Sequence, residues 1–214
     1  MEKIKKYTLG EEIFNSVTHG VGAGLSVAGT VVLIVFSAIY GNAWAVVSSS
    51  IYGASLIILY TMSTLYHSLT NEKAKKFFRI MDHNTIFLLI AGTYTPITLY
   101  ILGGVVGWVL FGIVWGAAVI GITANSINLE KAKIPSIFCY VATGWVIIFA
   151  IKPLMAKIPF ISGLFLIIGG AFYTLGIIFY AIKKVKYFHS VWHLFTIGGS
   201  VFHYFSILLA VINM

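Results

Sequence analysis

The chain has 214 residues and a formal net charge of +8, with 59% hydrophobic and 9% charged residues. Soluble domains carry about 25% charged residues, so this composition excludes an ordinary water-soluble domain. In a chain this apolar, the positive charge is more typical of loop lysines that set membrane orientation than of a nucleic-acid binder, and we expect no nucleic-acid partner. The length predicts one domain of the all-α membrane class, residues 1–214.

Charge-free stretches locate the predicted membrane spans, each of which needs about 20 mostly apolar residues. Residues 13–71 carry no acidic side chain, lysine or arginine and are long enough for two spans, with a turn at Gly41. Residues 83–129 are equally free of charge and break at Gly103. We expect helices throughout, because a backbone in lipid must satisfy its own hydrogen bonds. The sequence therefore predicts a seven-helix bundle with spans at 14–40, 43–69, 81–102, 105–127, 134–151, 159–182 and 188–212.

The basic residues lie almost wholly on one side of this predicted bundle. With the N-terminus in the cytoplasm, twelve of the fourteen lysines and arginines fall on the cytoplasmic side, and only Lys152 and Lys157 fall outside. The twelve are Lys3, Lys5, Lys6, Lys73, Lys75, Lys76, Arg79, Lys131, Lys133, Lys183, Lys184 and Lys186. Short loops follow the positive-inside rule. We therefore expect a multi-pass protein of the cytoplasmic membrane with its C-terminus outside.

Ionisable side chains gather at one depth of the predicted bundle, where they are costly and indicate function. His67 ends the second span, Asp82 opens the third, and His189 and His193 open the seventh. Residues four apart share one helix face, so His189 and His193 can bind one metal ion, with His67 as a third ligand. Three protein ligands and a water are typical of catalytic zinc. Asp82 is then either a fourth ligand or a residue that holds the metal-bound water. Taken alone, the HxxxH pair is also typical of two histidines at the membrane interface.

Four more polar residues lie near this predicted zinc site. Ser63 precedes His67 by one turn on the same face, and either bonds its own helix backbone or braces the reacting groups. Glu12, Asn15 and His19 form one stripe at the start of the first span. The stripe predicts a set of side chains that position the metal ligands, with a favourable charge at a helix N-terminus as the alternative for Glu12.

Three other ionisable residues are expected to stay out of the site. We expect Glu11 to be solvated. His203 lies ten residues beyond His193, about 15 Å further along the helix, and is expected to be structural. His83 neighbours Asp82, so both cannot face one point, and we assign the site to Asp82.

These residues together resemble a known family. The motifs are Glu12-x2-Asn15-x3-His19, Ser63-x3-His67, Arg79-Ile80-Met81-Asp82-His83, Ala91-Gly92-Thr93-Tyr94-Thr95-Pro96 and His189-x3-His193. In this order they resemble the haemolysin-III branch of the progestin and adipoQ receptor family. The resemblance implies a seven-helix bacterial membrane protein with zinc on His67, His189 and His193 and with Asp82 at or near the bound water. The wider superfamily contains receptors and alkaline ceramidases, which hydrolyse a lipid amide.

Three functions follow as hypotheses. The first is a zinc-dependent hydrolase of a lipid amide or ester at the cytoplasmic side, with Asp82 and Ser63 as catalytic residues and a membrane lipid as the partner. The second is a non-catalytic sensor or regulator of membrane state with structural zinc. A channel or cytolytic protein ranks last, because the spans are too apolar for a wide channel. The sequence names neither the substrate nor a protein partner.

Overall fold

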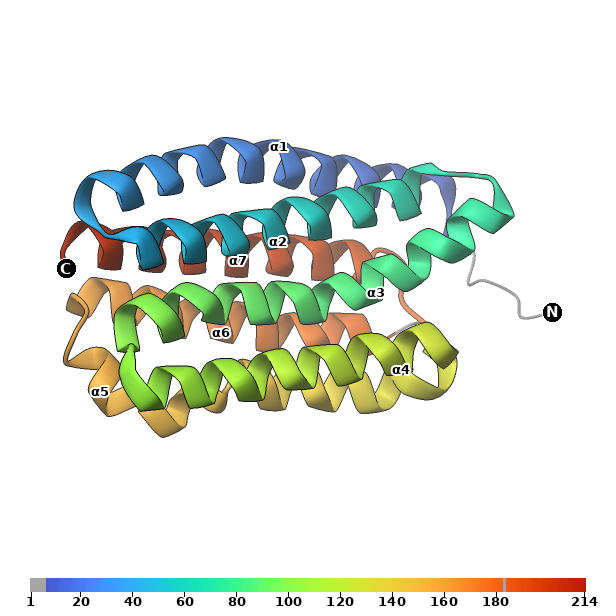
Figure 1. Ribbon diagram of the computed structural model, residues 1–214. Helices are drawn as coiled ribbons and strands as arrows, with labels where there is room; N and C mark the ends of the chain where they lie inside the picture. Colours follow the sequence, from blue (N-terminus) through green and yellow to red (C-terminus); the bar gives the residue numbers. More distant parts are fainter. Residues whose placement is uncertain (1–6, 183) are drawn as a thin grey trace.

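The computed structural model describes residues 7–182 and 184–214 (Figure 1). Lys3, Lys5, Lys6 and Lys183, which count towards the predicted orientation, lie outside the described residues. The described part is all-helical and contains no strand. Its elements are α1 (Leu9–Tyr40), α2 (Ala43–Ser68), α3 (Glu72–Thr95), η1 (Pro96–Leu102), α4 (Gly104–Gly144), η2 (Val146–Ala150), α5 (Ile151–Met155), α6 (Phe160–Ala181) and α7 (Phe188–Ile212).

The long helices pack side by side in a closed ring. Each of α1, α2, α3 and α4 contacts the next, α4 contacts α6, and α7 packs between α6 and α1. Figure 1 shows that α1 and α7 run in the same direction, so α7 ends at the opposite end of the bundle from the start of α1. The first residues of both helices therefore lie at one end.

The bundle is apolar on its surface and buries polar as well as apolar side chains. Large apolar side chains such as Phe149, Val105 and Ile127 point outward with at least 80% of their surface exposed. Asn15 and Asn125 are completely buried, together with many serines and threonines. The apolar surface suits a protein that is surrounded by lipid, because only apolar side chains face hydrocarbon without cost.

The predicted turns are confirmed by their capping residues. Asn42 caps α2 by accepting hydrogen bonds from the backbone N–H groups of Trp44 and Ala45. Gly103 and Gly104 separate η1 from α4 with φ of +59° and +57°, a region that favours glycine. Both breaks lie where the sequence predicts them.

Pro96 ends the regular part of the third helix. The chain continues as wider, π-type turns in η1, because proline has no N–H for the α-helical ladder. The hydroxyls of Thr95 and Thr98 donate to the carbonyls of Ala91 and Tyr94, at 2.8 and 2.7 Å. Nearby hydroxyls thus meet backbone acceptors around the proline.

Six helical segments of the described residues are long and apolar enough to cross a membrane, against seven predicted spans. The difference lies in residues 104–155, a single helical stretch of 52 residues. At about 1.5 Å per residue this stretch is far longer than the roughly 30 Å hydrocarbon layer. Its backbone leaves helical geometry at Asn128, with φ −155° and ψ 93°.

Asn128 marks a reversal of the chain inside this stretch. Its side-chain oxygen accepts from the N–H of Lys131, which is how an N-cap residue starts a helix. Ser136 donates to the side chain of Asn125 at 2.8 Å, although eleven residues of straight helix would separate them by about 16 Å. Figure 1 shows the chain turning back here. The helix after the turn already begins at Leu129, so the predicted start at Ile134 is late.

Candidate metal centre

Three histidines meet at the end of the bundle where α1 and α7 begin. His67 comes from the last turn of α2, and His189 and His193 come from the first two turns of α7. One ring nitrogen from each lies within 4.8 Å of the others. The Nε2 atoms of His189 and His193 are 3.2 Å apart. The structure thus brings together the three histidines selected from the sequence.

Glu12 fixes the tautomer of His67. The Nδ1 atom of His67 lies 2.6 Å from Oε2 of Glu12, and a carboxylate only accepts, so this nitrogen carries the proton. The other carboxylate oxygen accepts from Lys75 at 2.7 Å. The lone pair of His67 is therefore on Nε2, the nitrogen left for a metal.

These donors fit a zinc ion. Zinc binds imidazole at about 2.0–2.1 Å, so two nitrogens of a tetrahedral site lie about 3.3 Å apart, close to the separation between His189 and His193. The Nε2 atom of His67 is buried and has no hydrogen-bond partner among the described residues. Leaving such atoms unpaired costs about 1–3 kcal/mol each, a cost that a bound cation removes at a ligating nitrogen.

Asn15 and His19 contact these histidines from α1. The amide nitrogen of Asn15 lies 3.5 Å from Nδ1 of His67, and its oxygen accepts from Ser190 at 2.6 Å. The ring of His19 stacks on His193 with centroids 3.6 Å apart. The stripe predicted on the first span therefore faces His67 and His193.

Asp82 and Ser63 share a cavity with the histidine cluster. The cavity has a volume of about 20 Å³ and is lined by His189, His193, Asp82 and Ser63, among others. That volume is enough for one water molecule. The hydroxyl oxygen of Ser63 is buried and has no partner in the part of the chain that is described. Asp82 lines this cavity but is not one of the three residues of the histidine cluster.

Glu11 is buried, with only 7% of its surface exposed, which corrects the expectation that it is solvated. One of its carboxylate oxygens accepts from the backbone and hydroxyl of Thr8, in a capping box that starts α1. The other accepts from the N–H of Tyr187 at 2.9 Å. Tyr187 precedes α7 and has a φ of 62°, so Glu11 holds the start of the helix that carries His189.

Sequence reasoning also missed three aromatic or imidazole groups at the site. The ring of Tyr7 stacks on His189, with centroids 5.0 Å apart. Burial raises the pKa of the Tyr7 phenol, so it stays neutral. His83 donates from Nδ1 to the carbonyl of Arg79, and its Nε2 accepts from the hydroxyl of Tyr180 at 3.1 Å. His83 lines the same cavity as Asp82. This corrects the expectation that His83 stays out of the site because neighbouring residues on a helix point apart.

Two further cavities adjoin the central one. A polar cavity shares His83, Tyr180 and His189 with it and lies towards the start of α7. An apolar cavity of about 100 Å³ shares Trp192 and Thr196 with it and extends to His203. His203 donates to the carbonyl of Leu166 and lies apart from the histidine cluster, as expected. The three cavities form a series that is polar at one end, lined by His189, His193, Asp82 and Ser63 in the middle, and apolar at the other end.

Comparison with known proteins identifies the family. The sequence model of the family described as Haemolysin-III related matches residues 7–204. The chain belongs to the haemolysin-III-related family. A Bacillus subtilis (strain 168) relative, Hemolysin-3 homolog, is 44% identical over 202 residues, which cover 94% of this chain and 95% of the relative. Bacillus cereus Hemolysin-3 is 42% identical over 213 residues, covering 99% and 97%.

The similarity of this haemolysin-III-related chain extends to animals. Monocyte to macrophage differentiation factor of Homo sapiens is 27% identical over 210 residues, covering 94% of this chain and 85% of the relative. The family resemblance predicted from the motifs is confirmed. With its six apolar helical segments in the described residues, the chain is a multi-pass membrane protein.

Proposed function

We propose that this haemolysin-III-related protein is a zinc-dependent hydrolase that cleaves an amide or ester of a membrane lipid. The observation that carries the proposal is that His189 and His193, two of the three clustered imidazoles, share one small cavity with a carboxylate and an unpaired hydroxyl. His67, His189 and His193 would hold the ion. When bound there, zinc supplies Lewis-acid activation of water and of a carbonyl group.

The side chains around the cavity have distinct roles in this reaction. Asp82 accepts a proton at its carboxylate as the water oxygen adds to the carbonyl carbon. Ser63 donates its hydroxyl hydrogen to the carbonyl oxygen as negative charge develops there. The bond from carbon to the amine nitrogen or alcohol oxygen then breaks, and the proton held by Asp82 passes to that leaving atom.

The series of cavities supports an amphiphilic substrate. The apolar cavity lies beside Trp192 and is lined mainly by aliphatic and aromatic side chains of α3, α4, α6 and α7. A hydrocarbon chain that moves from lipid into such a cavity stays in apolar surroundings, so the transfer carries no large hydrophobic cost. An acyl chain there places its carbonyl at the central cavity and its head group in the polar one.

The test is turnover of a lipid panel by purified, metal-loaded protein. Ceramides, acyl amides and phospholipids in mild detergent should yield a free fatty acid from at least one class, and a chelator should stop the release. Full metal loading with no turnover of any class would overturn the hydrolase proposal. That result would favour a sensor with structural zinc, because Glu12 and Lys75 also tie α1, α2 and α3 together around His67.

Glu12→Ala is expected to weaken zinc binding about 10- to 100-fold, because His67 loses the partner that fixes its tautomer. Competition with a zinc-binding dye measures this affinity. Glu72→Ala removes an acidic residue from the exposed start of α3 and serves as the matched control. Equal affinities for the two variants would contradict the role given to Glu12.

We also propose seven membrane crossings in the cytoplasmic membrane, with the N-terminus inside and the C-terminus outside. The reversal at Asn128 supports two crossings within residues 104–155. Green fluorescent protein fused after Lys186 should fluoresce, and alkaline phosphatase fused there should be inactive. After Met214, across α7, both results should reverse. A fluorescent fusion after Met214 would contradict this orientation.

A further inference from the structure

A groove lies along the reversing helix α4 and shares no lining residue with the three cavities around the metal centre. Its volume is about 450 Å³, which is within the range of small-molecule sites. One wall is the arm of α4 before Asn128, and the other is the arm after it. We call it the hairpin groove and define it by Phe87, Gly121, Ala124, Lys131, Ala132 and Pro135.

Small residues in both arms keep the hairpin groove hollow. Gly121 has no side chain, and a Cβ atom at this position would collide with the ring of Phe87. The same ring lies 4.4 Å from the ring of Tyr140 in the second arm, measured between centroids. Phe87 of α3 therefore closes the groove between the arms, whereas Ala124 and Ala132 are too small to fill it.

The groove opens on the outer surface of the bundle. Ile120 and Ile127 line it and are 71% and 80% exposed. Because the chain is a multi-pass membrane protein, these apolar side chains face lipid. Water is a poor occupant of an apolar space, since it finds few hydrogen-bond partners there. The apolar part of the groove therefore suits an acyl chain of a neighbouring lipid.

Lys131 and Asn128 form a polar end of the groove at the reversal of the chain, and both are exposed. Within the part of the chain that the structure describes, the ammonium of Lys131 has no ion pair or hydrogen bond. The side-chain oxygen of Asn128 accepts from the backbone N–H of Lys131, which leaves the two N–H donors of the amide available. An ammonium beside amide donors suits a phosphate group.

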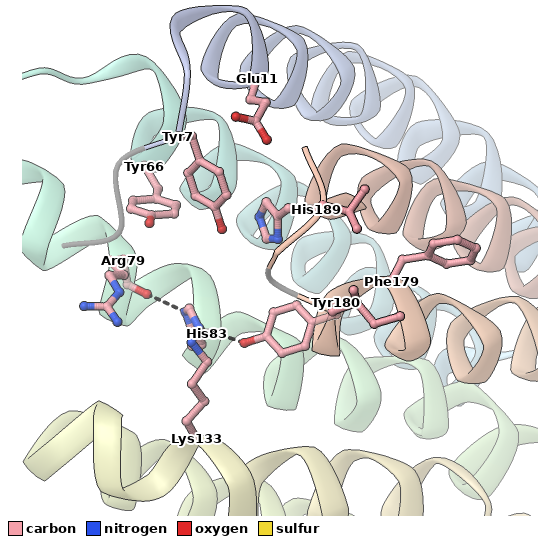
Figure 2. Close-up of a pocket in the computed structure, with 11 residues that line it drawn as sticks. Tyr7, Glu11, Tyr66, Arg79, His83, Lys133, Phe179, Tyr180 and His189 are labelled. Carbon is pink, nitrogen blue, oxygen red and sulfur yellow. Dashed lines mark hydrogen bonds between the residues drawn. The ribbon is translucent and has the colours of Figure 1, made fainter. Parts of the chain in front are cut away.

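The charged neighbours of Lys131 leave its charge uncompensated. Glu130 pairs with Arg79 of α3, so these two charges offset each other, and neither residue lines the groove. Lys133 lines the polar cavity instead, and Figure 2 shows its side chain directed from α4 towards His83. Among the described residues, none of those that line the groove is acidic. The polar end of the groove therefore carries one net positive charge.

We propose that the hairpin groove binds one anionic phospholipid, with an acyl chain between the arms of α4 and the phosphate at Lys131 and Asn128. A zwitterionic lipid has the same phosphate, but the cation of its head group opposes the charge of Lys131. This site is separate from the proposed hydrolase site, and it stands or falls independently of lipid hydrolysis.

The test is competition between two lipids with the same acyl chains, dioleoyl phosphatidylglycerol and dioleoyl phosphatidylcholine. Both are added in equal amounts to protein in mild detergent, and native mass spectrometry measures the ratio in which the chain retains them. Phosphatidylglycerol should be favoured at least about fivefold, as expected for one basic side chain near an anionic head group. Lys131→Gln should remove this preference. Lys76→Gln should keep it, because Lys76 is an exposed lysine of α3 outside the groove.

A second pair of variants tests the position of the acyl chain. Ala124 is exposed and lines the groove, so the phenyl ring of Ala124→Phe occupies the space between the arms. This variant should lose retention of both lipids. Val109→Phe adds a phenyl ring at an exposed position of the same helix outside the groove, and it should retain both lipids as the wild type does.

Each contrary result overturns a stated part of the proposal. Equal retention of the two lipids by the wild type, or equal effects of Lys131→Gln and Lys76→Gln, would overturn the preference for an anionic lipid. Unchanged retention by Ala124→Phe would overturn the groove as the site of the acyl chain. A dimer in detergent that Ala124→Phe dissociates would assign the groove to a second copy of the chain.

Discussion

Replacing Asp82 with asparagine is expected to lower lipid hydrolysis about 10²- to 10⁴-fold while leaving the zinc content unchanged. The amide keeps the size of the carboxylate but cannot accept the proton of the attacking water. Asp82 lies on the wall of the central cavity and outside the three-histidine cluster, so the ion keeps its three nitrogen ligands. The measurement is kcat for fatty-acid release beside zinc per chain in the same preparation.

Two outcomes would contradict this account of Asp82. Loss of zinc in Asp82→Asn would make Asp82 a direct ligand. Near wild-type turnover with zinc retained would remove it from the reaction. Glu72→Gln is the matched control, because it changes an acidic residue of the same helix outside the cavity, and it should keep both zinc and activity.

Replacing His193 with alanine is expected to weaken zinc binding by more than about 100-fold. This loss is larger than the one expected for a residue that only positions a ligand, because the replacement removes a ligand itself. His193 is 1% exposed and its Nε2 lies 3.2 Å from that of His189, so its loss removes one of the three clustered nitrogens. Zinc retained through purification should fall from about one ion per chain to almost none, and hydrolysis should fall with it.

His203→Ala is the control for this loss. His203 is on the same helix, but it contacts the carbonyl of Leu166 and lies in the apolar cavity. Its replacement should leave zinc in place. Zinc retained by His193→Ala, or lost equally from both variants, would contradict the assignment of the ion to the three-histidine cluster.

The histidine cluster could be predicted because it depends on local geometry. The spacing of His189 and His193 places both rings on one helix face. The lengths of the apolar runs then bring the end of the second span and the start of the seventh to one depth, where His67 lies. Helix periodicity sets which residues share a face, and helix length sets their depth in the membrane. Neither property requires knowledge of long-range packing.

Contacts between distant segments could not be predicted in the same way. Glu11 resembles a solvated residue at a helix start, yet it accepts from Tyr187, 176 residues away. His83 follows Asp82 directly, and its place in the cavity wall depends on Tyr180 of α6. Asn128 is one of several asparagines, and only the fold shows that it caps a reversing helix. Each of these positions is set by tertiary packing.

Zinc K-edge X-ray absorption on purified wild-type protein, never exposed to a chelator, is the most direct test of the metal centre. The account predicts about one zinc per chain, with about three imidazole ligands and one oxygen near 2.0–2.1 Å. A shell of sulfur atoms at about 2.3 Å would contradict the predicted site, because the site has no cysteine and the chain has only one. The absence of zinc would contradict it as well. Either result would remove the basis for metal-dependent hydrolysis.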